Sequence, residues 1–362
     1  MKVLHLPTNV ASQISVTVRA LRDIGVDARG LVLKNAATQD GRCIECYSKF
    51  SRRKYPIRGT IQRLKWRRAV LKAIHWADVV HWHCGSPTLR KDHDLRYVAM
   101  LDKTRIAEFW GSEIRVPEIA SADNPYIARM YQSHPELARG KHKRSLNAQR
   151  RFARYGFECL VPDSEMASYI QKDIWSSPYK SRQRLITSEF ETKYPNIGNS
   201  RPLLVHTPSN KAKKGTEVIL KAIDQLKSKY EFDFQLIHGV EHSKAFEIMR
   251  NADIMIDEVV HGAYGLAALE AMAFGKPTLC YIKPSLVSQY PDDLPIINAN
   301  QENLTEVLAG LLENGQMRHE IGRRSRAYVE KHHDAHKIAK ELVAIYEELI
   351  SKRKRKKPVV KS

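Results

Sequence analysis

The chain has 362 residues, 43% of them hydrophobic, and a formal net charge of +20 at pH 7. This length suits two domains of ordinary size, each with its own core. The charge indicates an anionic partner: nucleic acid, acidic lipid or an anionic substrate. No run of about 18 apolar residues occurs, which excludes a membrane-spanning helix at the level of sequence. The first residues, MKVLHLP, are typical of a strand and not of a signal peptide.

Five cysteines are present, an odd number, and two of them fall in strand-like apolar runs. This usage indicates reduced thiols in an intracellular protein, not a disulfide framework. Cys43 and Cys46 form a lone Cys-x-x-Cys pair without a second pair of ligands at suitable spacing. We therefore expect no metal site.

The first half of the chain alternates predicted strands and helices, as in doubly wound α/β folds. Strands are predicted at Lys2–Leu6, Val26–Leu33, Asp78–Gly85, Arg105–Trp110 and Phe157–Val161, with helices at Gln13–Ile24 and Lys141–Tyr155. In an open sheet, ligands bind at the carboxyl ends of the strands, so His83, Ser86 and Gly111–Glu113 should face one crevice. A strand histidine is more often a core residue, so both interpretations of His83 stay open.

The run Lys49–Lys72 contains ten lysines and arginines and no acidic residue. Within it, Ile57, Ile61 and Leu64 recur at helical spacing, with Trp66 among the basic residues. A basic amphipathic helix of this kind suits an anionic membrane surface. The alternative is a solvated basic face on a helix packed against the first domain. Lys352–Lys357 is predicted to be a disordered basic tail.

Glu189–Ser200 reads as an inter-domain linker, and a second alternating series follows it. Its strands are predicted at Leu203–His206, Phe234–His238, Ala252–Ile256, Thr278–Ile282 and Ile296–Ala299, and its last helices at Glu302–Glu313, Met317–Tyr328 and His336–Ser351.

The most informative stretch is His261–Ile282, HGAYGLAALEAMAFGKPTLCYI. A Gly-containing turn leads into a predicted helix from Leu266 to Phe274, which Gly275 and Pro277 end. Backbone N–H groups at Tyr264-Gly265-Leu266 would face the positive end of this helix and suit a phosphate. Glu270, one turn further in, could accept hydrogen bonds from ribose hydroxyls.

This stretch closely resembles the signature of the family-four retaining glycosyltransferases. Tyr264-Gly265 matches the family's Phe-Gly, and Glu270-Ala271-Met272-Ala273, Gly275 and Pro277 match the remainder. The resemblance implies the α/β GT-B architecture, two Rossmann-like domains facing across a cleft. It implies an acceptor-side domain at 1–188, a linker at 189–200 and a nucleotide-sugar-binding domain at 201–331. A helix at 332–351 would cross back to the first domain, followed by the tail at 352–362.

By the same resemblance, Glu270 holds the nucleotide ribose, and the backbone of Gly265 and Leu266 holds the donor diphosphate. Lys214-Gly215 matches the family's Lys-Gly, whose lysine neutralises that diphosphate. The family's arginine falls on Ser209, and Lys211 is the expected substitute. Two lysines can offset the negative charge of the donor diphosphate, so no metal is expected. No cofactor is expected either, because the nucleotide sugar is a substrate.

Three positions depart from the family pattern. The first Glu of its Glu-x7-Glu pair falls on Gly262, and Asp257, Glu258 or His261 could supply the missing polar group. Trp110 stands where the family has a histidine, ahead of Gly111, Ser112 and Glu113. Ala11-Ser12 replaces the family's Gly-Gly in the first loop. The predicted catalytic candidates are His83, Glu113, Asp257 and His261, with Ser12, Trp110, Gly111 and Ser112 on the acceptor side.

The sequence thus predicts a retaining, hexosyltransferase-like enzyme that moves a sugar from a nucleotide donor to a glycan or lipid-linked acceptor. Its setting would be cytoplasmic, on the inner face of a membrane through Lys49–Lys72 and Lys352–Lys357, in the synthesis of surface polysaccharide or glycoconjugate. A non-catalytic relative that binds nucleotide sugars is one alternative, suggested by Gly262 and Trp110. A nucleic-acid-binding protein is another, suggested by the charge. The basic segments are dispersed and match no nucleic-acid-binding motif, so no specific nucleic acid is expected.

Overall fold

The computed structural model describes residues 1–36, 39–47 and 56–356. The chain divides into two compact units. The first unit comprises residues 1–115, 140–184 and the C-terminal segment from residue 335, and the second comprises Val116–Arg139 and Leu185–Asp334. Each unit contains one parallel β-sheet, so the α/β class and the two Rossmann-like sheets predicted from the sequence are confirmed.

The sheet of the first unit has seven parallel strands in the order β3-β2-β1-β4-β5-β6-β7. The strands are β1 (Lys2–Leu6), β2 (Asp27–Val32), β3 (Ile44–Cys46), β4 (Val79–His83), β5 (Thr104–Glu108), β6 (Glu158–Val161) and β7 (Tyr179–Lys180). The strand order reverses between β1 and β4, which creates a topological switch point at their carboxyl ends. Polar residues at the ends of β1, β4 and β5 therefore lie together.

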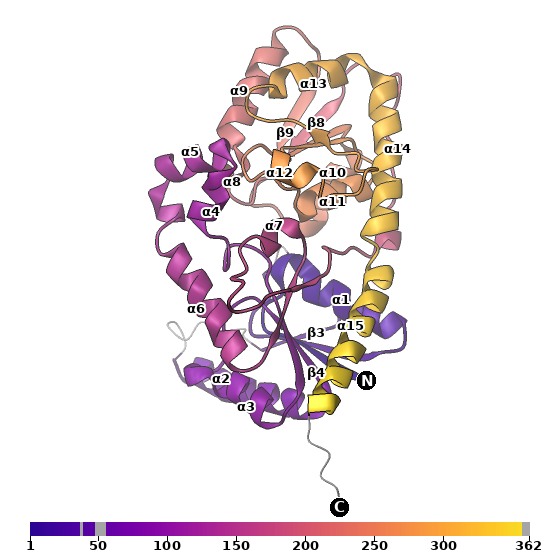
Figure 1. The fold of residues 1–362 in the computed structure, drawn as a ribbon. Coiled ribbons are helices and arrows are strands. Elements are labelled where there is room, and N and C mark those ends of the chain that lie inside the picture. The colour runs from indigo at the N-terminus through magenta and orange to yellow at the C-terminus, as the bar shows by residue number, and fades with distance from the viewer. Residues whose placement is uncertain (37–38, 48–55, 357–362) are drawn as a thin grey trace, which may run out of the picture. The chain divides into compact units, whose positions relative to one another are not determined.

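The helices of the first unit are α1 (Gln13–Asp23), α2 (Pro56–Trp76), α3 (His93–Met100), α6 (Lys141–Arg154), α7 (Ser164–Ala167) and α15 (Ala335–Lys356), with 3-10 turns η1 (Val10–Ser12) and η2 (Arg90–Asp92). Helix α15 packs against α1 and β5 (Figure 1). Trp82 packs against Phe152 and Phe157 in the core. Asp163 caps α7 by accepting a hydrogen bond from Met166 N at 2.7 Å.

The sheet of the second unit has five parallel strands in the order β12-β11-β10-β8-β9. They are β8 (Leu203–His206), β9 (Asp233–Leu236), β10 (Ile254–Glu258), β11 (Thr278–Cys280) and β12 (Ile297–Asn298). Its switch point lies between β8 and β10. Alternate residues of these strands enter two different core clusters, with Leu204 and Ile254 in one and Val205 and Met255 in the other. Both faces of the sheet are therefore buried, as in doubly wound folds.

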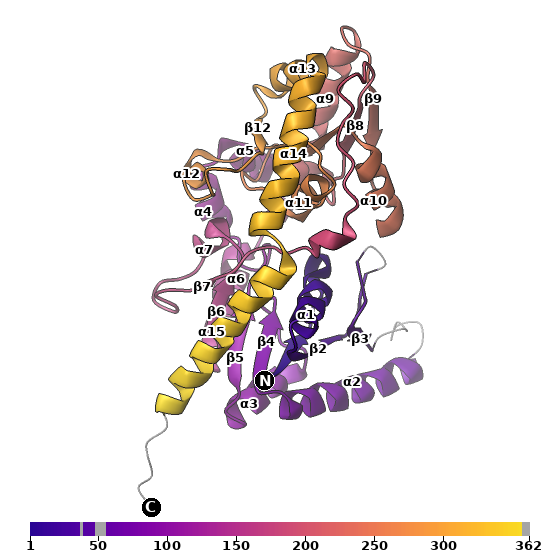
Figure 2. The ribbon, with the colours of Figure 1, turned by 90° about the vertical axis from the view of Figure 1, so that its right-hand side faces the viewer.

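The helices of the second unit are α4 (Pro117–Ala122), α5 (Pro125–Ser133), α8 (Lys211–Lys214), α9 (Thr216–Lys227), α10 (His242–Asn251), α11 (Leu266–Ala273), α12 (Pro284–Val287), α13 (Leu304–Glu313) and α14 (Gly315–His332), with η3 (Pro135–Leu137) and η4 (Thr187–Glu189). One core cluster contains residues of α9 and α13, and the other contains residues of α11 and α14. Figure 2 shows α14 and α13 in the orange part of the chain.

The unit boundaries differ from the expected ones at one place. The sequence assigned everything up to residue 188 to the first domain, whereas Val116–Arg139 packs with the second unit. The reason is local: the side-chain nitrogen of Asn124, just before α5, donates hydrogen bonds to Val260 O at 2.8 Å and His261 O at 2.9 Å. These contacts join residues more than 130 positions apart, which no local pattern signals.

The expectation of a disordered tail from residue 352 is wrong for residues 352–356, which continue α15. Lys352 forms an ion pair with Glu348 at 2.6 Å, one helical turn earlier, and donates to Tyr179 Oη at 2.8 Å. Arg353 donates to Asp102 O. Lys357 lies outside the described residues. Among the helices that the structure describes, none is long and apolar enough to cross a membrane.

Candidate functional site

A buried carboxylate and a lysine meet at the switch point of the second unit. Asp257, near the end of β10, is fully buried, and its Oδ1 lies 2.6 Å from Lys214 Nζ, at the end of α8. Gly265 N donates to Asp257 Oδ2 at 3.3 Å. A Cβ at Gly265 would lie 3.8 Å from Lys214 Nζ, so the start of α11 adjoins the same lysine.

Lys214 stays charged in this setting. Burial works against its charge, but Asp257 and Glu258 more than offset burial and raise the pKa of Lys214 above its ordinary value. Its side chain is 17% exposed, whereas that of Asp257 has no exposed surface. The arrangement therefore presents the cation, and not the carboxylate, to a ligand.

The N-terminus of α11 provides backbone donors beside this cation. The helix starts after Gly265, which has no side chain to cap its first turn. The side chain of Tyr264 points into the core, where its hydroxyl lies 3.2 Å from both Tyr328 Oη and His333 Nε2. Leu266 packs against the same core cluster. Tyr264 and Leu266 can thus contribute backbone groups, but not side chains, to an anion site.

Another candidate ligand group in this region is the carboxyl group of Glu270, one turn into α11. Its side chain has no hydrogen-bond partner among the residues that the structure describes. Burial, with a contribution from the charge of Asp257, raises the pKa of Glu270 to about 8. Hydroxyl groups of a ligand could satisfy this half-buried carboxyl group.

In the turn Val259–Gly262, which precedes α11, three backbone N–H groups are bound by one carboxylate. Glu258 accepts hydrogen bonds from the backbone N–H groups of Val260 at 3.1 Å, His261 at 2.6 Å and Gly262 at 3.1 Å. Burial opposes the charge of Glu258, but the bonds from His261 and the charge of Lys214 lower its pKa below the ordinary value. Glu258 therefore shapes the turn and is not available to a substrate.

The carbonyl groups of the same turn are bound as well. The side chain of Asn124 donates to Val260 O and His261 O. Gln301 Nε2 donates to Val259 O at 3.2 Å, and Lys283 N donates to Gly262 O at 3.0 Å. Asn124 also caps α5, because its Oδ1 accepts from Tyr126 N at 3.1 Å. The turn is thus fixed by the neighbouring Glu258 through its N–H groups and by contacts distant in sequence through its carbonyl groups.

Gly262 has φ +83°, and a Cβ there would lie 2.8 Å from Lys283 Cβ. Any side chain would be strained and crowded, so a glutamate cannot stand at this position without moving Lys283. Of the three suggested substitutes, only His261 keeps a partly exposed polar group, with 15% of its side chain exposed. Its Nδ1 lies 2.9 Å from Lys213 O and donates to it, which leaves Nε2 as an acceptor in the neutral ring.

Lys211 is exposed at the start of α8. Its ammonium group forms no ion pair or hydrogen bond with any described residue. The structure thus places Lys211 on the same short helix as Lys214 but does not join the two side chains to one another.

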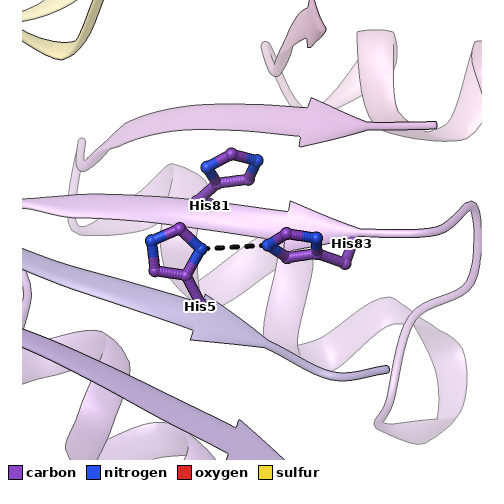
Figure 3. Close-up of side chains that lie close together, drawn as sticks. All are labelled: His5, His81 and His83. Carbon is purple, nitrogen blue, oxygen red and sulfur yellow. Dashed lines mark hydrogen bonds between the residues drawn. The ribbon is translucent and has the colours of Figure 1, made fainter. Parts of the chain in front are cut away.

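The switch point of the first unit contains three buried histidines, His5 on β1 and His81 and His83 on β4 (Figure 3). His5 Nδ1 and His83 Nε2 are hydrogen-bonded at 2.9 Å. Trp110 Nε1, which can only donate, lies 3.1 Å from His83 Nδ1. His83 therefore carries its proton on Nε2 and donates it to His5. Burial, reinforced by neighbouring charges, holds the pKa values of His5 and His83 well below the ordinary value.

Glu108 at the end of β5 completes this cluster. Its two oxygens accept from Arg184 Nη2 at 2.8 and 2.7 Å, and all three groups involved, Glu108, Arg184 and His81, are fully buried. His81 Nε2 lies 3.1 Å from Glu108, and His81 Nδ1 lies 2.6 Å from Tyr346 Oη. Burial opposes the charge of Glu108, but Arg184 and His81 lower its pKa.

A metal ion does not fit this histidine cluster. The rings of His81 and His83 are stacked 4.5 Å apart with an angle of 11° between their planes. The lone pairs of an imidazole lie in its plane, so two nearly parallel rings do not aim at one ion at a bond length of about 2.1 Å. The geometry favours a hydrogen-bonded cluster, and the prediction of His83 as a catalytic group finds no exposed surface to support it.

The remaining acceptor-side candidates lie at the ends of β1 and β5. Glu113 accepts from Trp110 N at 2.6 Å, and the Arg184 guanidinium carbon lies 5.1 Å from the centre of the Trp110 ring. Gly111 is buried and Ser112 is exposed. Ser12 is 8% exposed, and its hydroxyl accepts from Asp40 N at 2.8 Å. Trp110 is thus held by its neighbours, and Ser12 is engaged in its own loop.

Sequence analysis missed Asn124, Lys283, Glu108 and Arg184. Asn124-Pro125 is a recognisable helix start, since Asn is a good cap and Pro a good first residue. Its second role, binding the turn before α11, has no signal in the sequence. The same holds for the pair of Glu108 and Arg184, which are 76 residues apart.

Comparison with known proteins agrees with this geometry. Residues 231–328 match the family model of the glycosyl transferases group 1. No curated protein sequence matches the chain. The matched segment includes β10, the turn, α11 and β11, which hold most of the candidate site in the second unit.

Among solved structures, the fold is similar to sucrose-phosphate synthase from Thermosynechococcus elongatus, with a TM-score of 0.65 and 11% identity over 97% of this chain and 100% of the other. HepE from Anabaena in complex with UDP-glucose is similar with a TM-score of 0.61 and 11% identity, over 96% of this chain and 100% of the other. WaaG, a glycosyltransferase involved in lipopolysaccharide biosynthesis, is similar with a TM-score of 0.56 and 14% identity, over 96% of this chain and 99% of the other. These likenesses establish the GT-B fold of the chain.

Proposed function

Taking the GT-B fold and the group 1 glycosyl transferase segment as the premise, we propose that this protein transfers a sugar from a nucleotide-sugar donor to a glycan or lipid-linked acceptor, with retention of anomeric configuration. One observation carries the proposal. A charged, partly exposed lysine, an uncapped helix N-terminus and an unpaired carboxyl group meet at the switch point of the second unit. Together they match the diphosphate and ribose of such a donor.

The chemistry that these groups support is electrostatic. As the bond from the sugar C1 to the phosphate oxygen breaks, negative charge grows on the leaving diphosphate. Lys214, held in place by Asp257, and the first N–H groups of α11 stabilise that charge. The acceptor oxygen bonds to C1 on the same face, and its proton passes to the leaving phosphate. Lys211 is proposed as a second cation toward the diphosphate, and Glu270 as the ribose ligand.

The donor is tested first by binding. A panel of nucleotide sugars is screened for an increase in the melting temperature of the full chain, since a ligand that binds only the folded state stabilises it. The best donor is then incubated with candidate acceptors, and the anomeric configuration of the product is read by NMR. HepE is described in complex with UDP-glucose, so uridine diphosphate sugars are the first members of the panel. An inverted product would contradict retention.

A non-catalytic nucleotide-sugar binder is the second candidate. It is favoured by Gly262, where Lys283 occupies the space that a glutamate would need, and by the complete burial of His83. The two candidates differ in turnover. Saturable binding of a nucleotide sugar, with neither transfer nor slow hydrolysis of the donor at any acceptor tested, would support the binder and contradict the enzyme.

We also propose that the protein acts at an anionic membrane surface. On α2, the side chains of Ile57, Ile61 and Leu64 are 76%, 48% and 57% exposed, whereas Trp66 and Val70 are buried. At about 100° per residue, Ile57, Ile61 and Leu64 share one exposed face of α2, whereas Trp66 and Val70 lie on the opposite face, which packs into the first unit. Lys49, Arg52, Arg53 and Lys54 lie outside the described residues.

Exposed arginines and lysines flank the face of α2 that carries Ile57, Ile61 and Leu64. This pattern suits the headgroup region of an anionic leaflet. The test is co-sedimentation with vesicles of anionic or neutral lipid at physiological salt. A variant with Arg63, Lys65, Arg67 and Arg68 changed to Glu should lose binding to the anionic vesicles. Equal binding to both kinds of vesicle, or no loss in the variant, would contradict the electrostatic attraction.

A further inference from the structure

A pocket of about 560 Å³ lies beside α2 in the first unit. It is formed by one face of α2, the end of β2 and the segment around η2, and its lining residues include Leu33, Arg63, Leu64, Trp66, Arg67, Leu89, Arg90 and Lys91. Figure 2 shows α2 lengthwise at the periphery of the first unit. Its lining residues belong neither to the histidine cluster nor to the candidate site of the second unit, although Arg63, Leu64 and Arg67 also belong to the membrane surface proposed above.

The inner part of the pocket is apolar. Leu33 and Leu89 are partly buried, and Trp66 is only 2% exposed, with its Nε1 donating to Thr88 Oγ1 at 2.5 Å. This bond fixes the indole and joins α2 to the loop before η2. Leu64 belongs both to the pocket lining and to the exposed stripe of α2, so the pocket opens onto that stripe.

The rim of the pocket is cationic. Arg63, Arg67, Arg90 and Lys91 all line it and are all exposed. None of these four side chains forms an ion pair with a carboxylate of the described residues. Four charges that repel one another around one opening favour an anionic ligand, because its binding would remove that repulsion.

The carboxylates close to the pocket are already engaged. Asp94 is fully buried and accepts from the backbone N–H groups of Thr88 at 2.6 Å and Leu89 at 2.8 Å. Asp92 lies 3.6 Å from Arg151 Nε. Asp94 therefore builds the loop, and Lys91 and Asp92 follow with φ of +54° and +56°, a conformation that L-residues adopt only when their surroundings hold them there.

We propose that this pocket binds a single anionic lipid of the membrane, with the phosphate between the four cations and the first carbons of one chain against Leu64 and Trp66. A free phosphate would leave the apolar part uncovered, and a neutral lipid would leave the cations unpaired. The proposal depends on the membrane partner proposed above only for the source of the lipid. It makes α2 a site for one lipid molecule and not only a charged surface.

The test uses dihexanoyl phosphatidylglycerol below its micelle concentration, so that no membrane is present. The full chain should bind one molecule, counted by native mass spectrometry, with an affinity measured by calorimetry. Dihexanoyl phosphatidylcholine and inorganic phosphate should each bind at least about tenfold more weakly, since each forgoes charge pairing or apolar contact. Equal binding of either probe would overturn the proposal.

Two matched variants separate the pocket from general charge. The pocket pair is Arg67→Glu with Lys91→Glu, and the control pair is Lys65→Glu with Arg68→Glu, two exposed residues of α2 that do not line the pocket. Both pairs change the net charge equally. The pocket pair should abolish binding of the short-chain phosphatidylglycerol, and the control pair should weaken it by less than about threefold. Equal losses would mean that the lipid responds to overall charge and would overturn the pocket.

Two further comparisons keep the test decisive. Leu64→Ser should weaken the binding, and Ile57→Ser, at another exposed residue of α2 that does not line the pocket, should not. Arg67→Gln with Lys91→Gln replaces the pocket pair if the glutamate variants fail to fold. Neither result depends on sugar transfer, so a protein that binds no nucleotide sugar but still binds this lipid would contradict the proposed enzyme and leave the pocket supported.

Discussion

The two units place the same kind of group at the same topological position, a buried carboxylate beside a cation at the switch point of a parallel sheet. In the first unit, Glu108 and Arg184 are both fully buried, and histidines surround them. In the second unit, Asp257 is buried, but Lys214 is partly exposed, and Glu270 nearby has no hydrogen-bond partner among the described residues. The first cluster is shielded from solvent, although His5 Nε2 and Arg184 Nε have no hydrogen-bond partner among the described residues, and the second is partly exposed.

The difference indicates which cluster is structural and which is functional. A buried polar network whose members bind one another has little left to offer a ligand and mainly restrains the fold. A site with a partly exposed cation and an unpaired carboxyl group is stabilised when a ligand binds to both. On this comparison, the histidines of the first unit hold Trp110 and β5 in place, and the switch point of the second unit carries the proposed donor site.

The largest expected effect comes from opening the shielded cluster. Glu108→Ala leaves the Arg184 guanidinium buried without its carboxylate, which should lower the free energy of unfolding by about 3–5 kcal/mol. Urea unfolding followed by circular dichroism measures the loss. The double variant Glu108→Leu with Arg184→Met removes both charges and should regain most of the stability. A loss below about 1 kcal/mol in the single variant would show that the cluster is not a restraint.

The next largest effect should follow from removing the cation of the partly exposed cluster. Lys214→Ala should weaken binding of the nucleoside diphosphate and lower kcat, by roughly a hundredfold, with little change for the nucleoside alone. Lys211→Ala, which removes the proposed second cation, should have a smaller effect, because Lys211 is exposed and no described carboxylate holds it in place. If diphosphate and nucleoside lose affinity equally in calorimetry, Lys214 is not a diphosphate ligand.

Removing the free carboxyl group should have a moderate effect. Glu270→Ala leaves two ribose hydroxyls without partners, at a cost of about 1–3 kcal/mol in nucleotide binding. The fold should persist, because this side chain contributes no hydrogen bond to the described residues. Calorimetry with the nucleoside diphosphate and with its 2′,3′-dideoxy analogue measures the effect. Equal affinity of wild type and variant for the diphosphate would contradict the ribose role.

A further expected effect, measured without ligand, is a pH dependence of stability. The pKa of Glu270 is raised from an ordinary value of 4.5 to about 8, so the folded state binds more protons than the unfolded state between these values. Stability from this group is complete below pH 4.5 and is lost as pH rises through 8. Glu270→Gln should flatten the fall in melting temperature across that window. If melting temperature falls equally steeply with pH in the two proteins, the pH dependence does not come from Glu270.

The sequence by itself determined the elements and the order in which they alternate. The strand at Lys2–Leu6 and the helix beginning at Leu266 were predicted with the starts that the structure shows, because apolar periodicity and turn residues are local properties. The signature at residues 261–282 likewise pointed to the strand–turn–helix unit at which Lys214 and Glu270 meet. The resemblance that it carried named the GT-B fold correctly.

Tertiary structure alone decided which polar residues are available. His83 looked like a candidate beside a crevice, but Trp110 and His5 enclose it. Gly262 looked like a missing ligand, but its conformation and the packing of Lys283 exclude a side chain there. Residues 116–139 joined the second unit through Asn124, and α15 continued through Lys352 because Glu348 and Tyr179 pair with it. The sequence shows which groups can ionise or bond, but partners such as His81 and Tyr346 lie 265 residues apart and meet only on folding.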